Sequence, residues 1–77
     1  MSKLPKISGE EMVKILVKKF GFEVSRQRGS HVTLVKYESG RKIVTVVPLH
    51  KELKPGTVLG ILKLAEISRD EFLNAIS

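Results

Sequence analysis

His31 stands in a sequence context that suits proton transfer beside a phosphate. It directly follows Gly29 and Ser30, and it comes just after a basic stretch that contains Arg26 and Arg28. An imidazole titrates near neutral pH, so it can hold or release a proton there. RNA carries its own nucleophile, the 2′-hydroxyl, so a protein that moves one proton and stabilises charge on the phosphate can cleave it. His31 is therefore a candidate acid or base, while Gly29 would let the backbone approach a phosphate and Ser30 would orient the ring.

Cationic side chains near this histidine are candidates for holding the RNA backbone, because they replace phosphate counterions and stabilise developing charge. The candidates are Arg26, Arg28, Lys36, Lys42, Lys51 and Lys54. Lys51 and Lys54 precede a predicted helix, whose N-terminus adds a positive dipole end. His50 is a further candidate for contact with RNA; whether it also transfers a proton or is a turn residue that faces water stays open here.

Other chemistries are poorly supported by the sequence. With no cysteine, a thiol nucleophile, a disulfide and a thiolate metal site are excluded. The two histidines have only Glu52, beside His50, at metal-ligand spacing, so we expect no metal site. No phosphate-binding glycine motif occurs, so we expect no nucleotide cofactor. The plainest alternative for His31 is a half-exposed strand residue after an ordinary turn.

Size and charge limit the function classes. The 77 residues have room for one small domain, 1–77, and exclude a two-domain cofactor enzyme. Economical packing or self-association is expected for so small a core. The net charge is +6, and residues 1–54 carry all of the excess, which favours a polyanionic partner. No secretory signal or membrane span is visible, so we expect a cytoplasmic protein with no membrane partner.

Three amphipathic helices are predicted to surround this chemistry. Ser8 and Glu11 have the spacing of a capping box, and Gly21 suits the left-handed end of that helix. Pro55 suits the first turn of a second helix, and Ser68 opens a third with another capping box. The expected buried positions are Met12, Val13, Leu16 and Phe20, then Val58, Ile61, Leu62 and Ala65, then Phe72, Leu73 and Ile76.

Three strands are predicted between the first two helices, at residues 22–28, 31–37 and 41–48. Their short connections allow only an antiparallel meander. With Gly40 as the left-handed residue of a three-residue loop, Tyr37 would pair with Arg41. The core face would then hold Val32, Leu34, Val44 and Val46, and the other face His31, Thr33, Val35, Tyr37, Ile43, Thr45 and Val47. The fold class is α+β, in the order α-β-β-β-α-α, with the helices on one face of the sheet.

A set of short motifs recurs in one order over residues 8–73. They are S-G-E-E before the first helix, G-F at its end, R-Q-R-G-S-H entering the second strand, V-P-L-H after the third, and L-K-P-G-T-V-L-G-I-L-K followed by I-S-R-D-E-F-L. With these motifs the sequence resembles the HicA toxin family, also called YcfA-like. It departs from the family at Glu66, where glycine is common.

The resemblance implies a double-stranded-RNA-binding-like fold and the activity of an mRNA interferase, the toxin of a toxin-antitoxin system. It implies that the histidine of G-S-H, His31 here, is catalytic, and that a HicB antitoxin covers the active surface. We therefore expect a metal-independent endoribonuclease whose partners are mRNA and a HicB-like antitoxin. Two alternatives stay open. One is a non-catalytic module that reads RNA shape. The other is a protein that binds partners through the open sheet face, with Val35, Tyr37, Ile43 and Val47.

Overall fold

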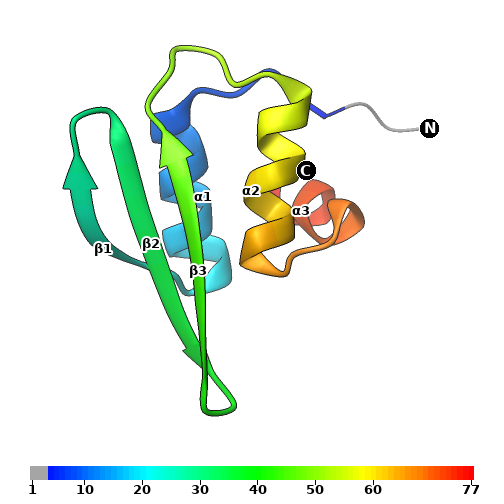
Figure 1. The fold of residues 1–77 in the computed structure, drawn as a ribbon. Helices are drawn as coiled ribbons and strands as arrows, with labels where there is room; N and C mark the ends of the chain where they lie inside the picture. The colour runs from blue at the N-terminus through cyan, green and yellow to red at the C-terminus, as the bar shows by residue number, and fades with distance from the viewer. Residues whose placement is uncertain (1–3) are drawn as a thin grey trace.

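The computed structural model describes residues 4–77, which form three helices and one antiparallel sheet (Figure 1). The elements are α1 (Gly9–Phe20), β1 (Glu23–Arg28), β2 (His31–Glu38), β3 (Arg41–Pro48), α2 (Pro55–Ala65) and α3 (Arg69–Ile76). The strands lie in the order β1-β2-β3. This is the α+β arrangement that the sequence predicts, and the α-β-β-β-α part agrees with a double-stranded-RNA-binding-like fold.

The predicted helix ends are confirmed. The Ser8 hydroxyl accepts the Glu11 backbone N–H at 3.1 Å, while the Glu11 carboxylate accepts the Ser8 backbone N–H at 3.0 Å. Gly21 ends α1 in the left-handed region, with φ of 76°. Ser68 and Glu71 repeat the capping box at α3. Each box satisfies backbone groups that the first helical turn leaves unpaired.

The end of α2 is less usual, because a residue other than glycine adopts the left-handed conformation. Glu66 has φ of 58°, and its backbone N–H donates to the last turn of the helix. Its carboxylate accepts hydrogen bonds from the Arg41 guanidinium, which ties the end of α2 to the beginning of β3.

The core lies between the sheet and the helices. Met12 and Leu16 of α1 and Phe72 of α3 are fully buried, as predicted, whereas Val13 and Phe20 are only half-buried. Leu73 and Ile76 are also half-buried. The buried apolar residues are Ile7, Met12, Leu16, Phe22, Val32, Leu34, Ile43, Val47, Leu53, Val58, Ile61, Leu62, Ala65, Ile67 and Phe72.

The predicted register of the β2–β3 hairpin is wrong by one residue. Glu38 pairs with Arg41 across a two-residue turn, so Tyr37 lies opposite Lys42. Both turn residues, Ser39 and Gly40, have positive φ, of 52° and 76°. A turn with two positive φ values matches the twist of the flanking strands, and it leaves no third loop residue.

The shifted register exchanges the two faces of β3. Ile43, Thr45 and Val47 are buried beside Val32 and Leu34, opposite to the assignment made from the sequence. The Thr45 hydroxyl is fully buried and donates to the Ile61 carbonyl of α2 at 2.9 Å. Val44 and Val46, expected in the core, are instead exposed on the face away from the helices.

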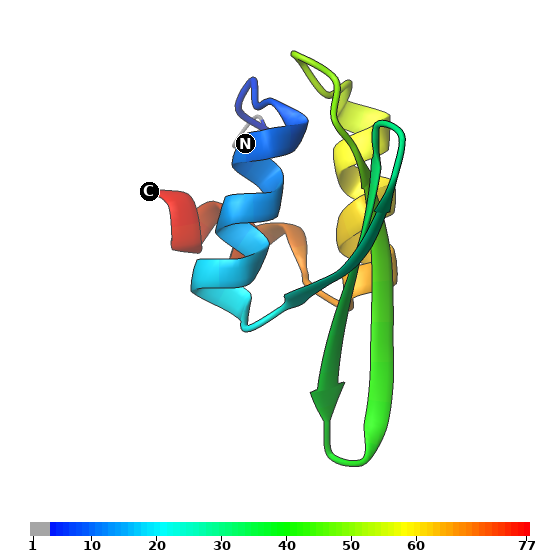
Figure 2. The ribbon, with the colours of Figure 1, turned by 90° about the vertical axis from the view of Figure 1, so that its left-hand side faces the viewer.

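We call that uncovered side the open face of the sheet. Alternation along each strand and the strand pairing assign its residues. They are Glu23, Arg26, Arg28, His31, Thr33, Val35, Tyr37, Lys42, Val44, Val46 and Pro48. Figure 2 shows that the β2–β3 hairpin extends well past the helices at one end of the molecule.

Candidate functional site

The β1–β2 turn places His31 at the beginning of β2. Arg28 and His31 are direct partners across a two-residue turn made of Gly29 and Ser30. Gly29 has φ of 59°, the conformation that glycine favours at the first position of such a turn. The Gln27 amide donates to the Gly29 carbonyl at 3.0 Å, which braces the turn. No atom lies within 4 Å of the place where a Cβ would sit on Gly29, so its backbone is open to a ligand.

A bulge in β1 separates Val24 from the two arginines that share a face with His31. The pairing of β1 with β2 shifts between Val24 and Arg26, so Ser25 is an extra residue in the strand. In a regular strand Val24, Arg26 and Arg28 would share one face. Because of the bulge, Val24 lies on the helix side while both arginines lie on the open face, next to His31 and Thr33. Nothing in the sequence signals this bulge.

The segment after β3 joins the same edge of the molecule. The Leu49 backbone N–H donates to the Ser30 carbonyl at 2.6 Å. His31 follows Ser30 and His50 follows Leu49, so each histidine is next in the chain to one partner of this hydrogen bond. The Gly9 N–H donates to the His50 carbonyl at 2.9 Å. These bonds hold the β1–β2 turn, the end of β3 and the start of α1 together.

Gly9 allows this close approach, and sequence reasoning misses its role. A Cβ at Gly9 would lie 2.1 Å from the Pro48 carbonyl oxygen and 2.7 Å from the Leu49 Cα. Only the absence of a side chain lets α1 begin against the end of β3. The only sequence signal is the position of Gly9 directly after the cap residue, which is not specific.

Lys51 and Lys54 follow His50 on this edge, and both are exposed. Lys54 is the N-cap of α2, and no side chain caps that helix. Figure 1 shows the β1–β2 turn, the loop after β3 and the beginnings of α1 and α2 at one end of the molecule. We call this end the histidine edge. It consists of residues 28–31, residues 49–54 and the first turns of α1 and α2.

In the part of the chain that the structure describes, exposed cations without an ion pair occur on the open face beside His31 and on the histidine edge, which also carries carboxylates in the first turn of α1 and at Glu52. Within residues 4–77, Arg26, Arg28, Lys51 and Lys54 form no ion pair, so their charges face the solvent. His31 is exposed as well, so its ring is accessible to a polymer rather than enclosed in the core. A mobile proton and unpaired cations on one surface are suited to phosphodiester chemistry.

The two other predicted cations lie elsewhere. Lys36 is on the helix side of β2, where its ammonium lies 5.7 Å from the centre of the Phe22 ring and 3.0 Å from the Glu38 carboxylate. Lys42 is on the open face, but its partner Tyr37 is six residues along β2 from His31, or about 20 Å. The structure thus gathers His31, Arg26 and Arg28 on the open face. Lys36 lies on the opposite face, and Lys42 lies far along the same face.

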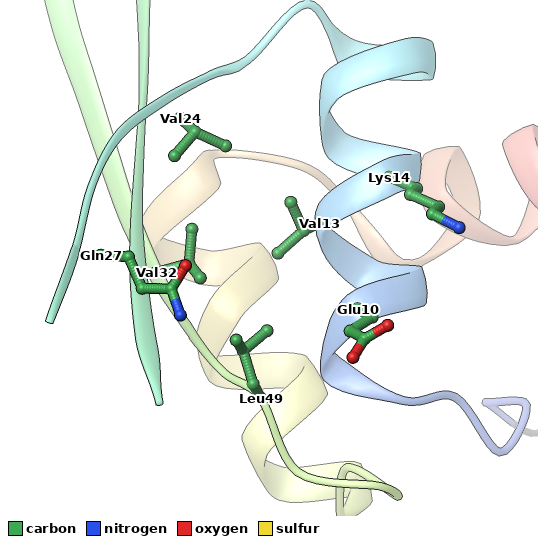
Figure 3. A pocket seen from close by; sticks show the side chains of 7 residues that line it. All are labelled: Glu10, Val13, Lys14, Val24, Gln27, Val32 and Leu49. Atoms are coloured by element: carbon green, nitrogen blue, oxygen red, sulfur yellow. The ribbon is translucent and has the colours of Figure 1, made fainter. Parts of the chain in front are cut away.

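A hollow of about 260 Å³ lies on the helix side of the sheet, between α1 and the strands (Figure 3). Its walls are apolar, with Val13, Val24, Val32 and Leu49 pointing into it, and Glu10, Lys14 and Gln27 complete the lining. His31 does not line this hollow, because its side chain lies on the other face of the sheet.

Two features are absent from residues 4–77. No three histidine, aspartate or glutamate side chains gather closely enough there to hold a metal ion. None of the helices in the same range is long and apolar enough to cross a membrane.

The fold and this site define a small α+β protein with an exposed histidine directly opposite an arginine. The model of the HicA toxin family, described as the HicA toxin of bacterial toxin-antitoxin systems, matches residues 9–67. This chain therefore belongs to the HicA toxin family, as its motifs indicate. Membership implies a HicB antitoxin as partner. No curated protein matches the chain.

Proposed function

We propose that this HicA toxin is an endoribonuclease that cleaves mRNA, with His31 as its general acid or base. The observation that carries the proposal is the exposed imidazole of His31 directly opposite Arg28 on the open face. A histidine in this place can exchange a proton with RNA while a guanidinium offers two donors to a phosphate. Membership of the HicA family supports the same activity.

The reaction needs only the RNA, the protein and water. The 2′-oxygen forms a bond to the adjacent phosphorus as the bond from phosphorus to the 5′-oxygen breaks. One proton leaves the 2′-hydroxyl and one reaches the departing 5′-oxygen; His31 handles one of these two transfers and a water molecule handles the other. The products are a 2′,3′-cyclic phosphate, or its hydrolysis product, and a 5′-hydroxyl.

The cations of the open face and of the histidine edge have different tasks in this reaction. Arg26 and Arg28 lie on the same face as His31 and stabilise the negative charge that develops on the phosphate. Lys51 and Lys54 hold neighbouring phosphates beside the free N-terminus of α2. A HicB-like antitoxin that covers the open face would block access to His31.

Cleavage of a labelled transcript at neutral pH tests this proposal. His31→Ala should lose cleavage by about 100-fold or more, because one positioned acid or base contributes about 10²- to 10⁴-fold. Its affinity for RNA should stay within a few-fold of wild type, since phosphate contacts supply most of it. Lys63→Ala, which changes an exposed lysine at the far end of α2, is the matched control and should cleave normally.

The same assay separates the alternatives. Wild-type cleavage should persist in EDTA. Full cleavage by His31→Ala, or loss of wild-type cleavage in EDTA, would count against the mechanism. Tight RNA binding without any cleavage by the wild-type protein would favour the non-catalytic RNA-binding module instead.

A further inference from the structure

Tyr37 is an exposed aromatic side chain that the reaction at His31 does not use. It is 72% exposed near the tip of the β2–β3 hairpin, on the open face and opposite Lys42. The three phenylalanines are at least half-buried, and the chain has no tryptophan. Tyr37 is therefore the one aromatic ring that offers its face to a large ligand.

The surface between Tyr37 and His31 is a continuous part of the open face. Thr33 and Val35 of β2 lie between them, with Val46 and Val44 as cross-strand neighbours. This surface is largely apolar, and cations stand at both of its ends.

The charges on the open face favour a polyanion as the ligand. Arg26 and Arg28 lie beside His31, and Lys42 lies beside Tyr37. Glu23 is the only carboxylate among the open-face residues. Proteins that bind single-stranded nucleic acids often combine an aromatic ring with a nearby cation. A base stacks on the ring, while the cation contacts the phosphate backbone of the nucleic acid.

We infer that Tyr37 and Lys42 form a second RNA subsite, in which an unpaired base stacks on the Tyr37 ring and Lys42 contacts a neighbouring phosphate. This inference rests on the proposed function, because it extends the RNA from the cleaved bond along the open face. The subsite lies about 20 Å from His31, six residues along β2. The RNA must therefore be single-stranded for several nucleotides on one side of the cleaved bond.

Tyrosine fluorescence tests this subsite directly, because Tyr37 is the only tyrosine and no tryptophan is present. The His31→Ala protein keeps the RNA intact during the titration. A single-stranded RNA of about 12 nucleotides, a length within the range that a small binding domain covers, should quench the fluorescence on binding. An abasic ribose-phosphate oligomer of equal length should not, because it carries the charge without the bases.

Binding by variants of Tyr37, made in the same His31→Ala background, supplies a second measurement. Tyr37→Ala should bind the RNA about tenfold more weakly, within the range found when a stacking aromatic is removed. Tyr37→Phe should bind like the parent. Tyr37→Leu, which keeps apolar bulk without a ring, should be as weak as Tyr37→Ala. The exposure of Tyr37 means that these changes should leave the fold intact.

Each failure has its own signature. Unchanged fluorescence together with unchanged affinity of Tyr37→Ala would overturn the subsite while RNA binding and cleavage at His31 stand. Weakened binding of a HicB-like antitoxin by Tyr37→Ala, with RNA binding unaffected, would assign this end of the open face to protein docking and overturn the inference. Absence of any RNA binding or cleavage by the wild-type protein would refute the proposed function itself.

Discussion

Gly9 offers a sharp test of how the histidine edge is held together. In the substitution Gly9→Ala, the new Cβ would lie 2.1 Å from the Pro48 carbonyl oxygen, although an ordinary contact needs at least 3.4 Å. The obstructing atoms are backbone, so a rotamer change cannot relieve the clash, and α1 and the end of β3 must move apart by more than 1 Å. That movement would weaken the bond from the Gly9 N–H to the His50 carbonyl.

The cost can be estimated from known effects of overpacking. Such strain costs about 1–3 kcal/mol, and replacing glycine by alanine in a helix returns about 0.5–1 kcal/mol. The difference is about 0–2.5 kcal/mol. Because the overlap is severe and involves backbone atoms, we expect Gly9→Ala to lie in the upper part of this range and to destabilise the protein by about 1–2 kcal/mol, a large part of the few kcal/mol that so small a core supplies. With a urea m-value of about 1 kcal/mol/M, the unfolding midpoint should fall by about 1–2 M.

Gly60→Ala is the matched control. Gly60 lies inside α2, and no atom stands within 4 Å of the place where its Cβ would be. There the substitution should raise stability by about 0.5–1 kcal/mol. Urea unfolding followed by circular dichroism measures both variants. If Gly9→Ala is as stable as wild type or as Gly60→Ala, the described contact between α1 and β3 is wrong.

Three further predictions concern the helix ends and the charges. Glu66→Gly should be more stable than Glu66→Ala by about 1 kcal/mol, because both lose the pairing with Arg41 and only glycine relieves the left-handed backbone; equal urea midpoints would contradict this. Hydrogen bonds from the Ser8 and Ser68 backbone N–H groups lower the pKa of Glu11 and Glu71. The ionised carboxylates of these two residues should therefore stabilise the fold at neutral pH, and this stabilisation should be lost as the pH falls below 4.5. A variant with Gln at both positions, followed by thermal melts, should lose less stability over that pH range. Lys54→Ala should reduce the slope of log affinity for single-stranded RNA against log salt concentration by about 0.7, while Lys63→Ala should leave this slope unchanged. Equal slopes for the two variants would show that Lys54 does not contact RNA.

Much of the fold was predictable because local signals and the hydrophobic pattern agree. The Ser8 and Ser68 capping boxes mark two helix beginnings, and Gly21 marks an end, where the structure has them. The buried stripe of α2 also follows its helical period. In these segments one interpretation satisfies propensity, capping and burial together.

The hairpin register was not predictable from the same signals. The run Ile43 to Val47 is apolar on both faces, so its pattern does not decide which side is buried. The decision depends on Ser39, which takes positive φ although it is not glycine. Sequence reasoning assigns such a conformation to Gly40 alone and so places one residue too many in the loop.

The sequence indicates which residue types the candidate site contains, but only partly how they are arranged. The residue types around His31 indicate proton transfer beside a phosphate. The bulge at Ser25, which pattern reasoning does not see, places Val24 on the helix side while both arginines share the open face with His31. The separation of Lys36 from His31 follows from strand alternation, which places residues five apart on opposite faces.

A transcript in which one ribose at a mapped cleavage position lacks its 2′-hydroxyl tests the central claim most directly. If the 2′-oxygen attacks the phosphorus with the help of His31, the wild-type protein will leave 2′,3′-cyclic phosphate and 5′-hydroxyl ends at ribose positions and will not cut at the deoxyribose. Cleavage at the deoxyribose at an equal rate, or products that carry 5′-phosphates, would show that water or another nucleophile attacks and would contradict the mechanism.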